Sequence, residues 1–109
     1  MEIAVTLERD AALQFERMRL VIALTEVNSR HLRAESRRAG ADIELAWALA
    51  AEQRDGVSPE GTANIARLRE RLDEAESGLR EIESDRERLA DELLRLESRA
   101  SSGTQGGWQ

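Results

Sequence analysis

The sequence has no cysteine, no lysine and few aromatic residues. Without cysteine, the chain can form no disulfide framework and no thiolate metal site, and it has no cysteine nucleophile. Aromatic residues make up 3% of the 109 residues, whereas charged residues make up 35%. A compact globular core normally uses more large rings than this. The composition is instead typical of long helices in which leucine and alanine supply the buried surface.

Long apolar runs and excess positive charge are also missing. The longest apolar run, Leu20 to Leu24, is far too short to cross a bilayer. The first residues lack the basic and apolar blocks of a signal peptide. A net charge of −6 disfavours nucleic acids and anionic membranes, because both attract proteins with positive charge. We therefore expect a cytoplasmic protein that binds neither nucleic acid nor membrane.

The second half of the chain carries a sustained heptad pattern. Apolar residues recur with 3-4 spacing and are interrupted by one charged residue, Arg86. The pattern comprises Ile65, Leu68, Leu72, Ala75, Leu79, Ile82, Arg86, Leu89, Leu93, Leu96 and Ala100. Such a/d spacing predicts a coiled-coil helix. Ser58, Pro59 and Glu60 supply a cap, a first-turn proline and an early acid, so this helix is expected over about 60–100. Pairs four residues apart support it: Glu76/Arg80, Arg88/Glu92 and Asp91/Arg95.

The first half is predicted to be a helix over about 6–54 with two apolar stripes. The first stripe comprises Ala11, Phe15, Met18, Ile22, Thr25, Ser29, Leu32, Ala39, Ile43, Ala46 and Ala50. The second stripe comprises Leu13, Leu20, Leu24, Val27, His31, Ala34, Ala41, Leu45 and Ala48. At about 100° per residue, their two-residue offset places the stripes on nearly opposite faces. Gly40 marks either a kink or break, with Asp42 capping a new helix, or a position inside one continuous helix, which we favour.

A turn between the two helices predicts a hairpin. Residues 55–59, Asp-Gly-Val-Ser-Pro, form a strong turn signal, and a short connection between helices of similar length makes them antiparallel neighbours. The expected fold is all-α: an antiparallel two-helix coiled-coil hairpin over residues 1–102 that assembles into a helical bundle by dimerisation. The glycine-rich residues 103–109 are expected to form a flexible tail.

The hairpin predicts a register in which residue i lies opposite about 114 − i. Basic residues then fall opposite acidic ones, namely Arg30, His31, Arg33, Arg37 and Arg38 opposite Glu76, Glu81, Glu83 and Asp85. Apolar residues 43–49 fall opposite Ile65, Leu68 and Leu72. Arg86 falls beside the polar residues Thr25, Asn28 and Ser29, with Glu26 as its expected counter-charge. A buried arginine needs such partners, and a polar layer fixes register at some cost in stability.

No grouping of residues indicates catalysis, a metal or a cofactor. His31 and Glu35 lie one turn apart, but two ligands without a second histidine or a cysteine make a weak metal site, so an interface or surface histidine is expected. Pairs such as Glu70 and Glu74 have no cleft to perturb their pKa values and are expected to form a solvated face. We therefore expect a protein that is not an enzyme, with no metal and no cofactor.

The remaining candidates concern binding. Arg30, Arg33 and Arg37 share a helix face, but no aromatic residues lie between them and the chain is acidic, so an ionic or solvated face is expected rather than a nucleic-acid site. Trp47 is expected in the core or an interface. Trp108 lies in the glycine-rich tail and is either a binding anchor or part of a disordered terminus, which we favour.

Helix one has one apolar stripe more than a hairpin can bury. We expect the second stripe to be left in water and to meet the same face of another copy in a two-fold homodimer. The alternative is that this stripe is the docking site for a different protein. The expected partner-binding residues are Leu13, Leu20, Leu24, Val27, Trp47 and Trp108. The sequence thus predicts a non-enzymatic protein–protein interaction module: an adaptor, chaperone or structural spacer. The alternative is a small acidic inhibitor, such as a phage-encoded one, that blocks a functional surface of a host protein.

Overall fold

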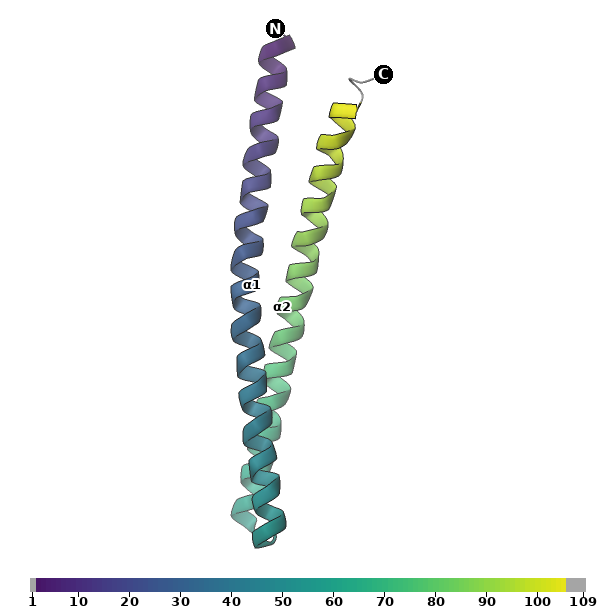
Figure 1. Cartoon of the computed structure of the whole chain (residues 1–109). Coiled ribbons are helices and arrows are strands. Elements are labelled where there is room, and N and C mark those ends of the chain that lie inside the picture. Colours follow the sequence, from purple (N-terminus) through teal and green to yellow (C-terminus); the bar gives the residue numbers. More distant parts are fainter. Residues whose placement is uncertain (1, 106–109) are drawn as a thin grey trace. The chain divides into compact units, whose positions relative to one another are not determined.

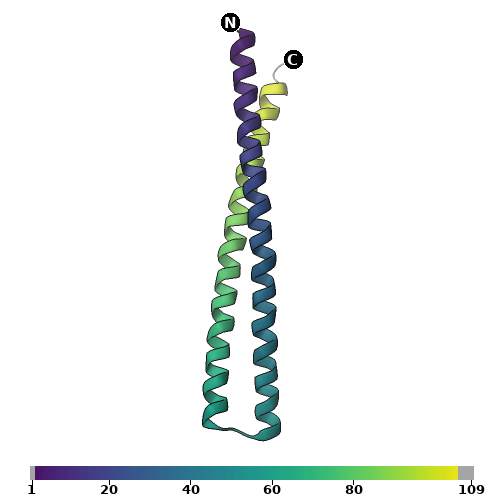
Figure 2. The same cartoon turned by 90° about the vertical axis from the view of Figure 1, so that its left-hand side faces the viewer.

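The protein is an all-α helical hairpin. The computed structural model describes residues 2–105 and contains two helices, α1 (Glu2–Asp55, 54 residues) and α2 (Pro59–Gln105, 47 residues). Figure 1 and Figure 2 follow the chain along α1, around residues 56–58 and back along α2. Residues 2–105 include no strand. The all-α hairpin expected from the sequence is confirmed.

Caps on both helices define the turn. Gly56 follows α1 with φ of 87°, a left-handed conformation that glycine adopts without steric cost. Its backbone N–H donates to the Glu52 carbonyl oxygen at 2.9 Å, as in a helix C-terminal cap. On the other side, the Ser58 hydroxyl accepts a hydrogen bond from the Gly61 N–H at 3.0 Å, and Pro59 is the first residue of α2. The cap and the first-turn proline are therefore confirmed.

The helix ends differ from the expected ones by a few residues. α1 begins at Glu2 rather than near residue 6, and its acidic side chain favours that end because helix N-termini carry partial positive charge. α1 is continuous through Gly40, as favoured. α2 continues to Gln105 rather than ending near residue 100, so residues 103–105 are helical and not part of a tail. No proline follows to stop the helix. Residues 106–109 lie outside the described residues.

The chain forms two compact units, of which unit 2 comprises Ser29–Glu83 and contains the turn. Its core beside the turn consists of Leu45, Ile65 and Leu68, which are 7–9% exposed, with Ala48, Leu49 and Leu72 packed against them. Large apolar side chains next to the turn anchor the two helices to each other there, because each buried leucine or isoleucine contributes about 1.5–3 kcal/mol. Farther from the turn, Ala34, Ala41 and Ile82 are also buried.

Unit 1 comprises residues 2–28 of α1 and 84–105 of α2 within the described chain. Leu20 and Val27 on α1 are each 2% exposed, and Leu96 on α2 is 3% exposed. The heptad positions of α2 in this unit behave as a seam, since Arg86, Leu89 and Leu93 are half-buried. The a/d pattern predicted for α2 therefore marks its packed face in both units.

Ion pairs between the helices report the register inside each unit. In unit 2, His31 Nε2 lies 3.3 Å from Glu83 Oε2, and Arg71 Nη1 lies 2.8 Å from Glu44 Oε2. In unit 1, Arg17 Nε lies 3.6 Å from Glu97 Oε1. The pairs His31/Glu83 and Arg17/Glu97 match the predicted register, in which the two residue numbers sum to about 114. The pair Glu44/Arg71 differs from it by one residue. The sequence predicted that basic residues 30–38 face acidic residues of α2. Within residues 2–102, His31 is the one of these basic residues that makes an ion pair across the hairpin.

Candidate interaction surface

The second stripe is the face of α1 that packs on α2. Its members Leu20, Val27, Ala34, Ala41 and Leu45 are buried, and Leu13, Leu24 and Ala48 are half-buried. The expectation that this stripe lies in water was therefore wrong. Leu13, Leu20, Leu24 and Val27 contribute to the packed face of the hairpin and do not form a free surface for another protein.

The reversal has a physical cause near the turn. From Leu20 onward, the second stripe has an unbroken 3-4 spacing when Arg38 and Glu52 are included, and both of these residues are half-buried. Leu45 anchors this line against Ile65 beside the turn. Because side chains three and four residues apart share a helix face, fixing Leu45 against α2 places the earlier members on that side in unit 2. The sequence showed both stripes of α1, but apolar spacing alone did not show which of them packs on α2.

The first stripe is the exposed face of α1. In unit 1, Phe15, Met18 and Ile22 are 72%, 62% and 54% exposed, and in unit 2, Leu32 and Ile43 are 65% and 52% exposed. Ser36 fills the one gap in the 3-4 spacing of this stripe. The twelve positions from Ala11 to Ala50, with Ser36 included, contain no charged residue. The first stripe therefore has the pattern of a second coiled-coil face with no partner helix among the described residues.

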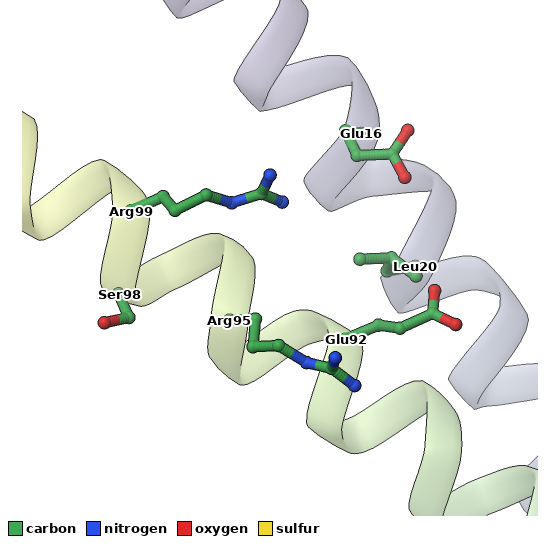
Figure 3. A pocket seen from close by; sticks show the side chains of 6 residues that line it. All are labelled: Glu16, Leu20, Glu92, Arg95, Ser98 and Arg99. Carbon is green, nitrogen blue, oxygen red and sulfur yellow. The ribbon is translucent and has the colours of Figure 1, made fainter.

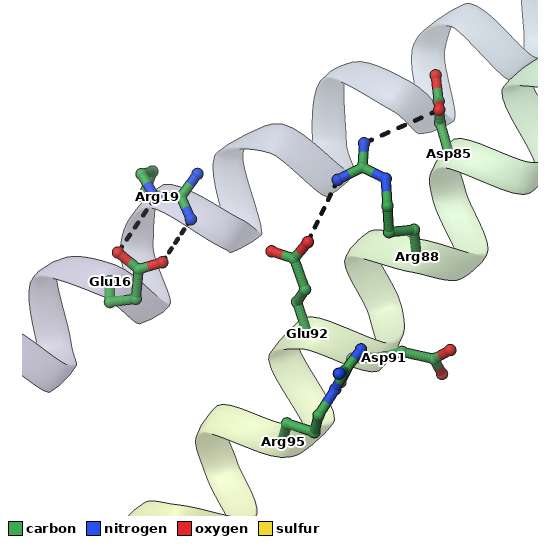
Figure 4. Close-up of polar contacts among 7 residues, drawn as sticks. All are labelled: Glu16, Arg19, Asp85, Arg88, Asp91, Glu92 and Arg95. Atoms are coloured by element: carbon green, nitrogen blue, oxygen red, sulfur yellow. Dashed lines mark hydrogen bonds and ion pairs between the residues drawn. The ribbon is translucent and has the colours of Figure 1, made fainter.

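Helix α2 has a different outer surface. Over its residues 59–102, the one large hydrophobic side chain that is strongly exposed is Leu94, at 64%. Most of the other exposed residues of α2 are charged. Some of them pair along the helix (Figure 4): Arg88 Nη1 lies 3.2 Å from Glu92 Oε1 and Arg88 Nη2 lies 3.8 Å from Asp85 Oδ1. The expected Arg88/Glu92 pair is thus confirmed. Arg95 instead donates to the Asp91 backbone carbonyl at 3.4 Å. Most of the exposed large apolar side chains therefore lie on α1.

His31 lies in the packed face of unit 2. It is 8% exposed, and its Nε2 lies 3.3 Å from Glu83 and 3.6 Å from Glu35. Both carboxylates are nearly half exposed, so they keep their hydration while the imidazole is buried. The interface role expected for His31 fits this position. Within the described residues, no group of three or more potential ligands is arranged to hold a metal ion.

The polar layer expected around Arg86 does not form. Glu26 is exposed, and within the described residues it makes no ion pair with Arg86, which is half-buried. The Thr25 hydroxyl donates to the Val21 backbone carbonyl at 2.9 Å and so satisfies itself within α1. Thr25 and Ser29 belong to the exposed first stripe. This expectation was wrong because it assumed that the first stripe of α1 faces α2, whereas the second stripe does.

A groove lies between α1 and α2 in unit 1. It has a volume of about 510 Å³ and is lined by Glu16, Leu20, Glu92, Arg95, Ser98 and Arg99. Figure 3 shows the Leu20 side chain directed towards α2 and the Arg99 side chain directed towards α1. The Arg19 guanidinium hydrogen-bonds to Glu16, with Nε 3.1 Å from Oε2, and this bond lowers the pKa of the Glu16 carboxyl. Charges of both signs line the groove, which favours no single charged ligand.

The remaining sequence candidates are exposed or undescribed. Arg30, Arg33 and Arg37 are exposed, as expected for a solvated face. Trp47 is 73% exposed and adjoins the first stripe beside Ala46, so it is accessible to a partner. Trp108 lies outside the described residues. The exposed members of the first stripe were missed as binding residues, although their uncharged 3-4 spacing was visible in the sequence.

Comparisons with known proteins assign no family to this chain. No protein-family model, no curated protein and no solved structure matches the chain. Within residues 2–105, neither helix contains a stretch long and apolar enough to cross a membrane.

Proposed function

We propose that this chain is a non-enzymatic protein–protein interaction module that binds through the first stripe on α1. The observation that carries the proposal is the exposure of five large apolar side chains on this stripe, Phe15, Met18, Ile22, Leu32 and Ile43. Soluble monomers rarely expose so continuous an apolar surface. A helix face with 3-4 apolar spacing fits a helix of another protein chain, because knobs on one helix fill holes on the other.

The module acts as an adaptor, a chaperone or a structural spacer in this proposal. The hairpin presents α1 as a preformed helix, so a partner need not order this surface when it binds. Preorganisation of this kind lowers the entropy lost on association. Exposed Trp47 enlarges the apolar surface next to Ala46, and tryptophan is enriched among residues that dominate interface energies.

The alternative, an acidic inhibitor acting by charge mimicry, has less support. Part of the charge on α2 is internally neutralised, since Arg88 lies near both Asp85 and Glu92. A mimic of nucleic acid presents unneutralised negative charge to a basic groove. The two proposals differ in their salt dependence. Partner binding through the uncharged first stripe should change little with ionic strength, whereas binding by charge mimicry should weaken steeply as salt is added.

Affinity capture from the native cell with matched variants tests the proposal. Leu32→Glu/Ile43→Glu places two charges on the first stripe, and Leu94→Glu places a charge on exposed apolar surface of α2. Proteins bound by the wild type, including further copies of the chain, should be lost with the α1 variant and retained with the α2 variant. Equal binding by wild type and the α1 variant would show that the first stripe is not the binding surface.

A further inference from the structure

We propose that the first stripe binds the first stripe of a second copy of this chain, with the two α1 helices antiparallel. The inference rests on the proposed function, since it names the partner of the same surface. It requires that a stripe be complementary to itself when one copy is turned end to end. Residue sizes and flanking charges along α1 meet that requirement in one register.

Residue sizes favour the antiparallel direction. Large side chains lie early in the stripe, with Phe15 and Ile22, whereas Ala39, Ala46 and Ala50 lie late. In a parallel pair every residue faces its own copy, so two Phe15 rings crowd one layer while alanines face alanines and leave gaps. An antiparallel pair can instead place Phe15 and Ile22 against alanines, and close packing of a core depends on such complementarity.

One antiparallel register aligns the whole stripe. Centring the two-fold axis between Ser29 and Leu32 places Phe15 against Ala46 of the second copy. By the same symmetry, Ile22 meets Ala39 and Met18 meets Ile43. This register overlaps all twelve positions from Ala11 to Ala50, and its central layers contain the small polar residues of the stripe.

Charges beside the stripe select the same register. Glu26 and Arg33 flank the stripe on one side, both are exposed, and neither makes an ion pair within residues 2–102. Because the helices run in opposite directions, residues on the same flank face one another across the dimer. Glu26 then lies beside Arg33 of the second copy, and symmetry repeats the pair. Flanking charges of this kind set partner and orientation in coiled coils.

Registers shifted by one heptad are disfavoured by like charges. A shift in one direction places Arg19 beside Arg33 of the second copy. A shift in the other places Arg33 beside Arg33 and Glu35 beside Glu35 across the axis. Like charges at an interface suppress wrong arrangements, so the shifted registers lose both stripe overlap and charge complementarity.

Charge reversal of the full chain tests this register. Glu26→Arg alone places two arginines together across the dimer, and Arg33→Glu alone places two glutamates together, so each variant should dimerise about tenfold more weakly or worse. In the mixed dimer of the two variants, position 26 of one copy lies beside position 33 of the other, so opposite charges meet at both sites. An equimolar mixture should therefore dimerise more tightly than either variant alone. Sedimentation equilibrium at micromolar concentration measures the dissociation constant of each dimer. Circular dichroism of each variant should show that the hairpin remains folded, because both residues are exposed.

Orientation has an independent readout, because the chain contains no cysteine. Ala12→Cys and Trp47→Cys place single thiols at positions that face each other across the proposed dimer. A short bis-maleimide should cross-link the mixture of these variants and leave each variant alone uncross-linked. Any one of three results would overturn the inference. The wild type could be monomeric, the charge-reversal variants could dimerise as tightly as wild type, or a single cysteine variant could cross-link on its own. If the wild type is monomeric while capture still depends on the first stripe, the proposed function stands and a different protein is the partner.

Discussion

At the scale of single residues, Gly40 and Gly56 differ in backbone conformation. Gly56 has positive φ and closes α1, whereas Gly40 has ordinary helical geometry and open space around it. A β-carbon added at Gly40 meets no atom within 4 Å, but one added at Gly61 lies 3.0 Å from the Ser58 hydroxyl oxygen. The conformation at Gly56 needs glycine, whereas that at Gly40 does not.

Gly40→Ala should stabilise the hairpin. Alanine restricts the unfolded chain and favours the helix, so the free energy of unfolding should rise by about 0.5–1 kcal/mol. Urea unfolding followed by circular dichroism measures the change. Gly56→Ala is the matched control and should lower stability, because φ there is 87°. A loss of stability in Gly40→Ala would indicate that α1 needs flexibility at that position.

At the scale of elements, the sequence predicted both helices, the turn and the register, because each leaves a local pattern. The α2 seam has almost uninterrupted apolar spacing, and Ser58 with Pro59 marks where α2 begins. Which stripe of α1 packs on α2 could not be predicted by hydrophobicity, since both stripes contain several large apolar residues. The packing of Leu45 against Ile65 beside the turn decided it, and this contact joins residues that are distant in sequence.

Arg86→Leu should be neutral or stabilising. Arg86 occupies a seam position, is half-buried and makes no ion pair within residues 2–102, so leucine removes a partly desolvated charge and adds apolar contact. Leu96→Ala is the comparison, because Leu96 is 3% exposed, and it should cost about 2–5 kcal/mol. Thermal melting of both variants measures the difference. A larger loss from Arg86→Leu would mean that Arg86 contributes contacts essential to unit 1.

At the scale of the whole molecule, the two helices have different tasks. The inner faces of α1 and α2 build the hairpin within each unit, the outer surface of α2 is mainly charged, and the first stripe of α1 remains apolar. A helix with two opposite heptad faces can pack against two neighbours at once. The first neighbour is α2, and the second is the proposed partner chain.

Thermal melting of two matched double variants tests most directly which face of α1 is free. Leu20→Glu/Leu24→Glu charges the second stripe, and Met18→Glu/Ile22→Glu charges the first stripe two residues away. At dilutions where every variant is monomeric, the second-stripe variant should melt about 10 °C or more below wild type, since Leu20 is 2% exposed. The first-stripe variant should melt within about 4 °C of wild type, as surface changes do. A second-stripe variant as stable as wild type, beside a strongly destabilised first-stripe variant, would contradict this account.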